Sequence, residues 1–313
     1  APKEILYYSK PHVGTDNLSK MVASIRSEIR KLGGEVRFSN KLVNVKTDNG
    51  EICGAVVESD SGEYVIETNN IVLAIGHSAR DTFLMLQNRN IAMEQKSFSV
   101  GARIEHSQEM INKSQYGKAY KKLPAADYKM AVHLESGRGV YTFCMCPGGQ
   151  VVASASEKGR VVTNGMSYHA RSGRNANAAV VVSVGGEDFG NDPRKAIAFL
   201  RELEARAYAA GRPGGEYAAP AENIQSFLEG RGRLNIGRVQ PTYDRGVVAA
   251  DLGALLPTEL ADTLRAGLRA YERKIAGYTA PEAILTGLET RTSSPVRLKR
   301  EENFECAQLA GLY

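Results

Sequence analysis

Tryptophan is absent from the 313-residue chain, and phenylalanine occurs only eight times. Proteins that bind single-stranded nucleic acids usually combine aromatic stacking platforms with basic residues, and this sequence has no Lys/Arg run interleaved with aromatic residues. The formal net charge of +5 favours anionic partners, but phosphates qualify as well as nucleic acid does. A nucleic-acid partner is therefore not favoured, and a small-molecule substrate is expected.

Long apolar runs and cysteine clusters are also missing. No segment approaches the ~20 apolar residues of a membrane span and no targeting segment stands at the start, so we expect a cytoplasmic chain without a membrane partner. The four cysteines, Cys53, Cys144, Cys146 and Cys306, are too few for a disulfide framework, which indicates a reducing compartment. Neither they nor the histidines show metal-ligand spacing, so no metal is expected. The oligomeric state is left open.

The first hundred residues alternate between strand and helix patterns. Residues 4–9 predict a strand, and 18–32 predict an amphipathic helix with Thr15 or Asp16 as its N-cap. Short alternating segments interrupted by DNG and DSG follow, and they predict an antiparallel meander. The next segment, IVLAI at 71–75, is apolar on both faces and predicts a buried parallel strand.

From about residue 97 the pattern changes. Six strand candidates separated by glycine-rich or polar turns predict one mixed or antiparallel sheet. Helices are expected at 194–210, 220–230 and 257–277, the first of them introduced by an Asp-Pro pair. Strand patterning returns at 284–298. The fold class expected from this order is α/β (α+β).

A phosphate-cradling glycine turn is missing as well. Gly-x-Gly occurs at Gly137/Gly139 and at Gly230/Gly232, but neither pair continues to a third glycine three residues later. The segment VLAIGHSARD at 72–81 is an apolar strand that ends at a glycine and leads into a helix. A core strand ending at a tight turn explains this pattern, and so does a strand ending beside phosphate or flavin.

The order of these segments resembles the FAD-dependent dehydrogenases related to the HI0933-like flavoproteins. The resemblance runs nearly end to end and is carried by GTDNL with its helix, GGEVRFSNKLVNVKTDNGEICGAVVE, VLAIGHSARDTFLML, FSVGARIEHSQEMINKSQYG, YTFCMCPGGQVVASASEKGRVVTNGMSYHAR, NANAAVVVSV and GLETRTSSPVRL. In that family a Gly-x-Gly-x-x-Gly segment precedes these motifs and a glycine-rich segment follows them. The resemblance therefore implies a middle fragment that lacks both ends of a glutathione-reductase-like FAD-binding domain.

The resemblance also implies a domain order: 1–96 as part of the FAD-binding domain, 97–285 as the substrate domain, and 286–313 as a return segment. Cys146 and His169 are the candidate catalytic residues. The implied FAD contacts are a strand position beside adenine, a turn beside the pyrophosphate, a loop toward the isoalloxazine and a segment returning to the flavin: Leu42; Gly76, His77, Ser78, Ala79 and Arg80; Pro147, Gly148 and Gly149; Arg291 and Thr292.

Two motifs leave chemical alternatives open. Cys144 and Cys146 lie two apart on a predicted strand and therefore point to the same face, which suits either a dithiol or small apolar packing. A bridge between them would be strained. Tyr168, His169 and Arg171 suit an anionic substrate or a nicotinamide phosphate, and a solvated loop explains them as well.

The function implied by the resemblance is hydride transfer between FAD and NAD(P)H or an unknown substrate, with the isolated chain free of cofactor. The alternative is a non-catalytic module that binds an anionic ligand or RNA through basic loops at Arg231, Arg233, Arg238 and Arg245. A third possibility is a flavoprotein that has lost its cofactor and kept a scaffold role. A Gly-x-Gly-x-x-Gly motif encoded upstream would support the fragment interpretation.

Overall fold

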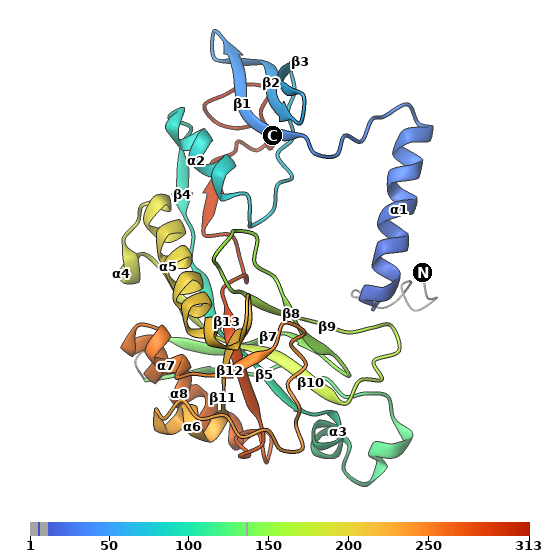
Figure 1. The fold of residues 1–313 in the computed structure, drawn as a ribbon. Helices are drawn as coiled ribbons and strands as arrows, with labels where there is room; N and C mark the ends of the chain where they lie inside the picture. The colour runs from blue at the N-terminus through green and yellow to red at the C-terminus, as the bar shows by residue number, and fades with distance from the viewer. Residues whose placement is uncertain (1–5, 7–11, 136) are drawn as a thin grey trace. The chain divides into compact units, whose positions relative to one another are not determined.

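The computed structural model describes residues 6, 12–135 and 137–313 (Figure 1). The strand predicted at 4–9 lies outside the described residues except for Leu6. The chain divides into two compact units, the first made of residues 1–24, 99–183 and 200–292 and the second of residues 25–98, 184–199 and 293–313. The predicted limits of an FAD-binding and a substrate domain concern function, and they stay a prediction.

The first unit is built on a seven-stranded mixed sheet with the order β12–β11–β13–β5–β10–β7–β6. The neighbours β11 and β12 run parallel, whereas the β10–β7, β11–β13, β13–β5 and β6–β7 pairs are antiparallel. The mixed α/β fold class is therefore confirmed. The strands are β5 (Phe98–Ser107), β6 (Ala131–His133), β7 (Gly139–Cys146), β10 (Asn175–Val184), β11 (Ala219–Asn223), β12 (Val247–Ala249) and β13 (Ile284–Glu289), with β8 (Gln150–Ala153) and β9 (Thr163–Met166) as a separate pair.

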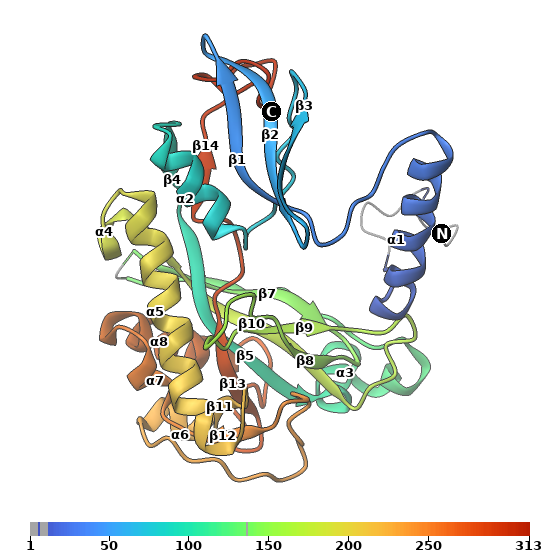
Figure 2. The ribbon, with the colours of Figure 1, turned by 45° about the horizontal axis from the view of Figure 1, so that its top comes forward.

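Helices pack closely on this sheet. Helix α8 (Thr258–Glu272) lies against β7, and α6 (Ile224–Glu229) and α7 (Leu252–Leu255) lie against β11 (Figures 1 and 2). The buried Tyr271 of α8 donates a hydrogen bond to the Val140 carbonyl at 2.8 Å. The other helices are α3 (Gln108–Tyr116), α5 (Pro193–Gly211), which continues from one unit into the other, and the short 3₁₀ turns η2 (Gly117–Lys122) and η3 (Arg212–Gly214).

The helix predicted at 220–230 is partly wrong. Residues Ala219–Asn223 form β11, which is completely buried between β12 and β13, and the helix α6 begins only at Ile224. The apolar spacing of this segment fits a helix face, but pairing with two neighbouring strands decides its first half. Tertiary context of this kind commonly overrides weak local propensity.

The second unit contains a three-stranded antiparallel meander, as predicted. The strands β1 (Lys41–Asp48) and β2 (Glu51–Ser59) are joined through Asn49 and Gly50, which both have positive φ, as a tight hairpin turn requires. Apolar residues of β1, β2 and the C-terminal segment form its core. The third strand of the meander is β3 (Gly62–Glu67). The second unit also contains α2 (Arg80–Asn88), α4 (Gly186–Phe189) and the antiparallel pair β4 (Met93–Gln95) and β14 (Val296–Leu298).

The buried parallel strand predicted at 71–75 is wrong. This segment makes a single parallel bridge, from Ile71 to Leu312, and the Leu73 amide donates to the Tyr313 carbonyl at 2.7 Å. Val72 is 74% exposed. Among the described residues, only the last three pair with this segment, so it has a neighbour on one edge and remains half exposed.

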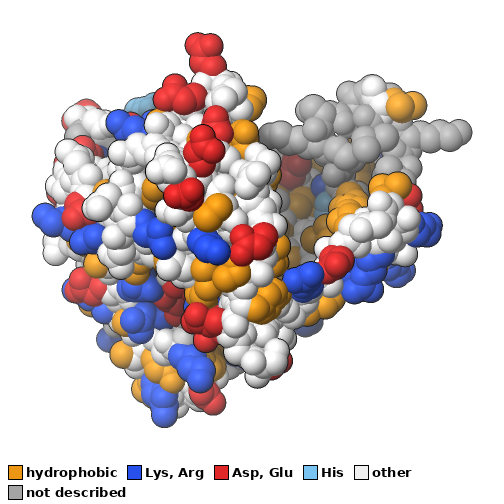
Figure 3. Space-filling model, turned by 90° about the horizontal axis from the view of Figure 1, so that it is seen from above, with side chains coloured by type: hydrophobic (Ala, Val, Ile, Leu, Met, Phe, Trp, Pro, Cys, Tyr) orange, Lys and Arg blue, Asp and Glu red, His pale blue; other side chains and the backbone are white. Residues whose placement is uncertain are grey.

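Helix α1 (Thr15–Lys31) confirms the predicted amphipathic helix, but the part of the chain that the structure describes leaves its apolar face exposed. Thr15 is already the first helical residue, so the predicted N-cap at Thr15 or Asp16 is wrong. None of its residues is buried, and Figure 3 shows hydrophobic side chains exposed along it beside lysines and arginines. The exposed apolar side chains are those of Leu18, Met21, Val22, Ile25 and Ile29.

Candidate active site

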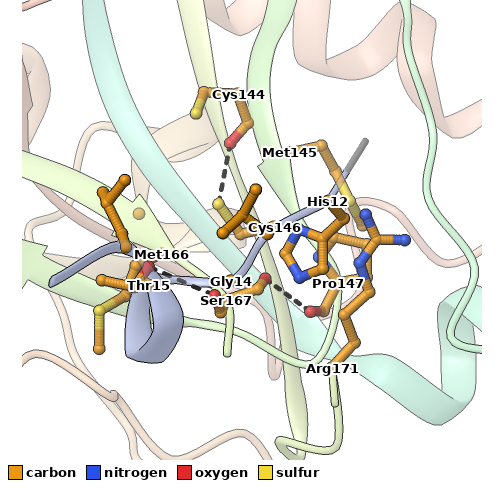
Figure 4. Close-up of a pocket in the computed structure, with 13 residues that line it drawn as sticks. His12, Gly14, Thr15, Cys144, Met145, Cys146, Pro147, Met166, Ser167 and Arg171 are labelled. Atoms are coloured by element: carbon orange, nitrogen blue, oxygen red, sulfur yellow. Dashed lines mark hydrogen bonds between the residues drawn. The ribbon is translucent and has the colours of Figure 1, made fainter. Parts of the chain in front are cut away.

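A pocket of about 310 Å³ lies in the first unit where three segments meet (Figure 4). Residues 12–18 lie on one side of it, the end of β7 on another, and residues 165–171 close it. The volume is within the usual range for small-molecule sites. Among the residues that line the pocket are His12, Cys144, Cys146, Gly165 and Arg171.

A β-bulge shapes the end of β7. Asn177 of β10 faces Cys146, whereas Ala179 faces Phe143, so β7 has one residue more than its partner in this interval. Cys144 has a positive φ of 46°, which is uncommon for a residue other than glycine. The bulge breaks the alternation of the strand, so Cys144 is exposed and Cys146 is buried. The expectation that both cysteines share one face is therefore wrong, although both line the same pocket.

The backbone of Cys144 is held by a buried cation and by the second thiol. The Cys144 carbonyl accepts a hydrogen bond from Nη1 of Arg103 at 2.8 Å and from Sγ of Cys146 at 3.3 Å (Figure 4 shows the second). Hydrogen bonding by the Cys146 thiol lowers the pKa of Cys144 to about 6, against the effect of burial, and the charge of Arg103 acts in the same direction. The pKa of Cys146 is raised, by its interaction with Cys144 and by burial.

A buried polar cluster lies next to these thiols. Arg103 is fully buried, its Nη2 donates to Asn164 Oδ1 at 3.0 Å, and its Nε lies 3.4 Å from Glu289 Oε2. Burial raises the pKa of Glu289 to about 7, although Arg103 opposes this shift. The amide of Asn177 is fully buried and has no hydrogen-bond partner within the described part of the chain. Because buried polar groups are normally paired, the Asn177 amide is a point at which a further polar group can form a hydrogen bond.

Glycine at position 165 permits this cluster. A Cβ on Gly165 would collide with the Asn177 side chain and come within 2.7 Å of the Arg103 guanidinium. Gly165 also lines the pocket. The pocket wall is thus thin at this point, and only a residue without a side chain fits between the pocket and the polar cluster.

The loop that contains His169 holds residues 12–16. The His169 amide donates to Asp16 Oδ1 at 2.8 Å, and its ring Nδ1 lies 3.1 Å from the Val13 carbonyl. His12 Nε2 lies 2.9 Å from the Tyr168 carbonyl, and the rings of His12 and His169 are stacked 6.0 Å apart. Of the two predicted catalytic residues, Cys146 therefore lines the pocket, whereas His169 joins two loops at its rim. A catalytic role for either stays a prediction.

The predicted flavin loop Pro147–Gly149 is tied to protein groups. The Gly148 amide donates to Gln108 Oε1 at 2.6 Å, and the Gly149 amide donates to the Asn175 carbonyl at 2.8 Å. Gly148 has φ +50°, and a Cβ there would collide with the Arg171 carbonyl. Close approach of two loops therefore explains these glycines, and their role toward a flavin stays a prediction.

The predicted return residues Arg291 and Thr292 also have protein partners. Thr292 Oγ1 donates to the Ser99 carbonyl at 2.9 Å, and Arg291 Nη2 lies 2.9 Å from Ser156 Oγ. Both contacts are within the first unit. Flavin contacts of these two residues remain untested predictions.

The second unit brings together the predicted adenine strand and pyrophosphate turn. An ion pair of 2.7 Å joins Lys41, next to Leu42 on β1, to Asp81 in the first turn of α2, and it lowers the pKa of Asp81. The N-cap residue Ala79 makes no side-chain cap of α2, and two of the first amides have partners: that of Arg80 donates to the Ser78 carbonyl and that of Thr82 donates to Asp81 Oδ1, both at 2.9 Å. Gly76 has φ +67° with open space at its Cβ position, and His77, Ser78 and Ala79 are half-buried between it and the buried Arg80. A glycine turn that leads into a helix is typical of phosphate sites, and a pyrophosphate contact of these residues stays a prediction.

Sequence reasoning missed the residues that support the thiols. Arg103, Glu289 and Asn177 come from three strands far apart in the sequence. The one visible signal is that a strand buried on both faces, β5, contains the charged residues Arg103 and Glu105. Charged residues are almost never fully buried unless they are paired, so they predict partners without identifying them.

Comparison with known proteins places most of this chain in one family. Residues 97–292 match the family model described as FAD-dependent protein, C-terminal domain-like. An uncharacterized protein of Clostridium beijerinckii is 47% identical over 317 residues, which cover 100% of this chain and 58% of that protein. The chain thus spans little more than half the length of this relative.

Solved structures show only remote likeness. A triple mutant of the flavin-dependent brominase Bmp2 is 12% identical, with 85% of this chain and 59% of that chain covered and a TM-score of 0.30. The anhydrotetracycline hydroxylase OxyS from Streptomyces rimosus is 14% identical, with 82% and 48% covered and a TM-score of 0.25. Values this low support no inference about the present chain.

Proposed function

The chain belongs to the family of FAD-dependent proteins that share this C-terminal domain, and from that premise we propose that it is part of a flavin-dependent oxidoreductase. The match over residues 97–292 is the observation that carries the proposal. In the proposed reaction, hydride passes between FAD and NAD(P)H or another small-molecule substrate. FAD would supply the two-electron chemistry, and the protein would bind and orient the reactants and exclude water.

Residues of the second unit are the proposed holders of the FAD pyrophosphate and adenine. The glycine turn at Gly76, with its positive φ, and the N-terminal end of α2, where the helix dipole favours negative charge, are the proposed neighbours of the pyrophosphate. Leu42 is joined to this turn by the Lys41–Asp81 ion pair beside it. Pro147–Gly149 and Arg291–Thr292 belong to the first unit, and their contacts to a flavin remain a separate prediction.

We further propose that residues outside these 313 complete the FAD site, as the predicted relation to the HI0933-like flavoproteins implies. The sequence contains no Gly-x-Gly-x-x-Gly turn to approach the pyrophosphate. Within the described residues the extended segment at 71–75 has one neighbour, and Val72 is exposed, as expected of a strand whose second partner is supplied from elsewhere. The isolated chain is therefore expected to bind FAD weakly or not at all.

Purification of two proteins side by side tests this proposal. The 313-residue chain is expected to be colourless, and the full-length Clostridium beijerinckii relative is expected to be yellow and to release FAD on denaturation. Anaerobic addition of NADH or NADPH to the relative should bleach its flavin absorption. A relative that neither contains nor binds FAD would refute the proposal, and a yellow 313-residue chain would refute only the part that concerns outside residues.

The alternative of a module for RNA or another anionic ligand has little support. Arg231 pairs with Glu229 at 3.1 Å, and Arg245 lies 3.9 Å from Asp244, so acidic neighbours offset two of the four basic loop residues. The matched family does not favour this alternative either.

A further inference from the structure

The two cysteines of the pocket are not used by the proposed flavin contacts. One is exposed and one is buried, and they line the same cavity. The exposed one lies on a bulge with a strained backbone, next to a buried arginine. Bulges and strained residues cluster at functional sites because the surrounding structure must hold them in place.

We propose that Cys144 and Cys146 form a thiol–disulfide exchange site whose substrate is a small disulfide bearing carboxylate groups. Cys144 is the attacking thiol because it is exposed to the pocket. Cys146 is the resolving thiol, because it is buried and its Sγ lies 3.3 Å from the Cys144 carbonyl oxygen.

The exchange is balanced without any further reactant. The Cys144 thiolate attacks one sulfur of R–S–S–R, the substrate S–S bond breaks, and a Cys144–S–S–R mixed disulfide and RS⁻ are formed. The departing RS⁻ takes the proton of Cys146. The Cys146 thiolate then attacks the Cys144 sulfur, the second RS⁻ leaves, and a Cys144–Cys146 disulfide remains. Two electrons pass from the cysteines to the substrate, which becomes two thiols.

Apolar packing, the rival explanation for the cysteines, does not account for their surroundings. Arg103 is fully buried and contacts the Cys144 carbonyl, Asn164 and Glu289. A cation in this position stabilises a thiolate, which is the reactive form of cysteine. Two thiols that only filled space would be better packed by aliphatic neighbours, because burying a charge is costly.

Arg171 indicates the charge of the substrate. Arg171 lines the same pocket as both cysteines, and Figure 4 shows its side chain beside His12 and away from the two thiols. Its Nε is buried and meets no hydrogen-bond acceptor in the described residues. Because a guanidinium group binds carboxylates through paired hydrogen bonds, a disulfide with carboxylates fits this pocket.

The strain of a two-apart pair also suits exchange better than a structural role. Only one residue, Met145, separates the two cysteines, and the bulge turns their side chains to different faces, so the backbone must shift for the disulfide to form and the disulfide is strained. Strained disulfides are easily reduced, and labile or catalytic disulfides are of this kind. The pair is therefore expected to stay reduced until it meets a disulfide, and to return to the dithiol in dithiothreitol.

The test uses the reduced 313-residue chain and two disulfides of matched size, 3,3′-dithiodipropionate and cystamine. The first carries two carboxylates and the second two ammonium groups. Thiol release and peptide mass mapping follow the reaction. We expect the wild type to release two thiols from dithiodipropionate and to form a Cys144–Cys146 disulfide. Cys146→Ser should stop at one adduct on Cys144, and Cys144→Ser should lose the reaction at this site. Cys53→Ser, which changes a cysteine of the other unit, should behave as the wild type.

Arg171→Gln tests the substrate class. It should lower the rate with dithiodipropionate relative to cystamine by about tenfold, since a charge-assisted pair is lost. An unchanged ratio would overturn the carboxylate assignment. Modification confined to Cys53 or Cys306, or equal rates in Cys144→Ser and wild type, would overturn the exchange site. Because the assay contains no flavin, its outcome is separate from that of the FAD experiment.

Discussion

Replacing Cys146 with alanine is the sharpest test of how the structure activates Cys144. The Cys146 thiol is the largest cause that lowers the pKa of Cys144 to about 6. At pH ~6 about half of Cys144 is thiolate, whereas an ordinary thiol of pKa ~8.5 is thiolate to only about 0.3%. The thiolate fraction therefore differs by about 150-fold between the two cases.

Nucleophilicity offsets part of this difference. A thiolate of lower basicity attacks more slowly, and a Brønsted coefficient of ~0.45 over ~2.5 pKa units reduces its rate about 13-fold. The expected net loss at pH ~6 in Cys146→Ala is therefore about tenfold at most. It will be smaller to the extent that Arg103, which remains in place, continues to lower the pKa of Cys144.

The assay is alkylation of Cys144 by iodoacetamide across a pH series, followed by peptide mass spectrometry. The wild-type midpoint is expected near the lowered pKa of about 6, and the Cys146→Ala midpoint should be higher. Labelling of Cys53 in the same samples serves as an internal control. Identical midpoints for Cys144 in the two proteins would refute the reasoning, because the second thiol would then have no influence on the first.

Three further predictions concern the fold around the site. Glu289→Gln should remove a pH dependence: burial raises the folded pKa of Glu289 from 4.5 to about 7, so its contribution is full below the unfolded pKa and is lost as pH rises through the folded one. Urea unfolding at about pH 5 and about pH 8 should show that the free energy of unfolding of the wild type falls by about 2.5 kcal/mol more than that of the variant between these two pH values. Gly148→Ala should cost at least about 2 kcal/mol through collision and strain, and Gly50→Ala, which also has positive φ but open space, about 1 kcal/mol; equal losses in thermal unfolding would contradict the close approach of the loops. Tyr271→Phe should cost about 1 kcal/mol by leaving the Val140 carbonyl without its buried donor, and an unchanged melting temperature would argue against that bond.

Local patterns in the sequence were sufficient for much of the fold. The 3.6-residue spacing of α1 and the DNG and DSG turns of the meander are satisfied by residues close in the chain, and both were found as predicted. The strand β5 was also recognisable, since Phe98, Val100, Ala102 and Ile104 recur at every second position. The same patterns do not reveal which strands become neighbours. Residues 71–75 and 220–223 were therefore assigned wrongly, because their structure depends on partners rather than on spacing.

The candidate site shows the same limit more sharply. The sequence alone places two cysteines near a strand end, and a histidine and an arginine in a later loop. The three-dimensional fold is needed to see that a bulge between the Asn177–Cys146 and Ala179–Phe143 pairs turns Cys144 outward, and that Arg103 and Glu289 are buried as a pair. Bulges arise from the register between two strands, and buried charges are tolerated only where distant strands bring their partners together. Neither property can be deduced from one segment of the chain, which is why the chemistry of this pocket became visible only in three dimensions.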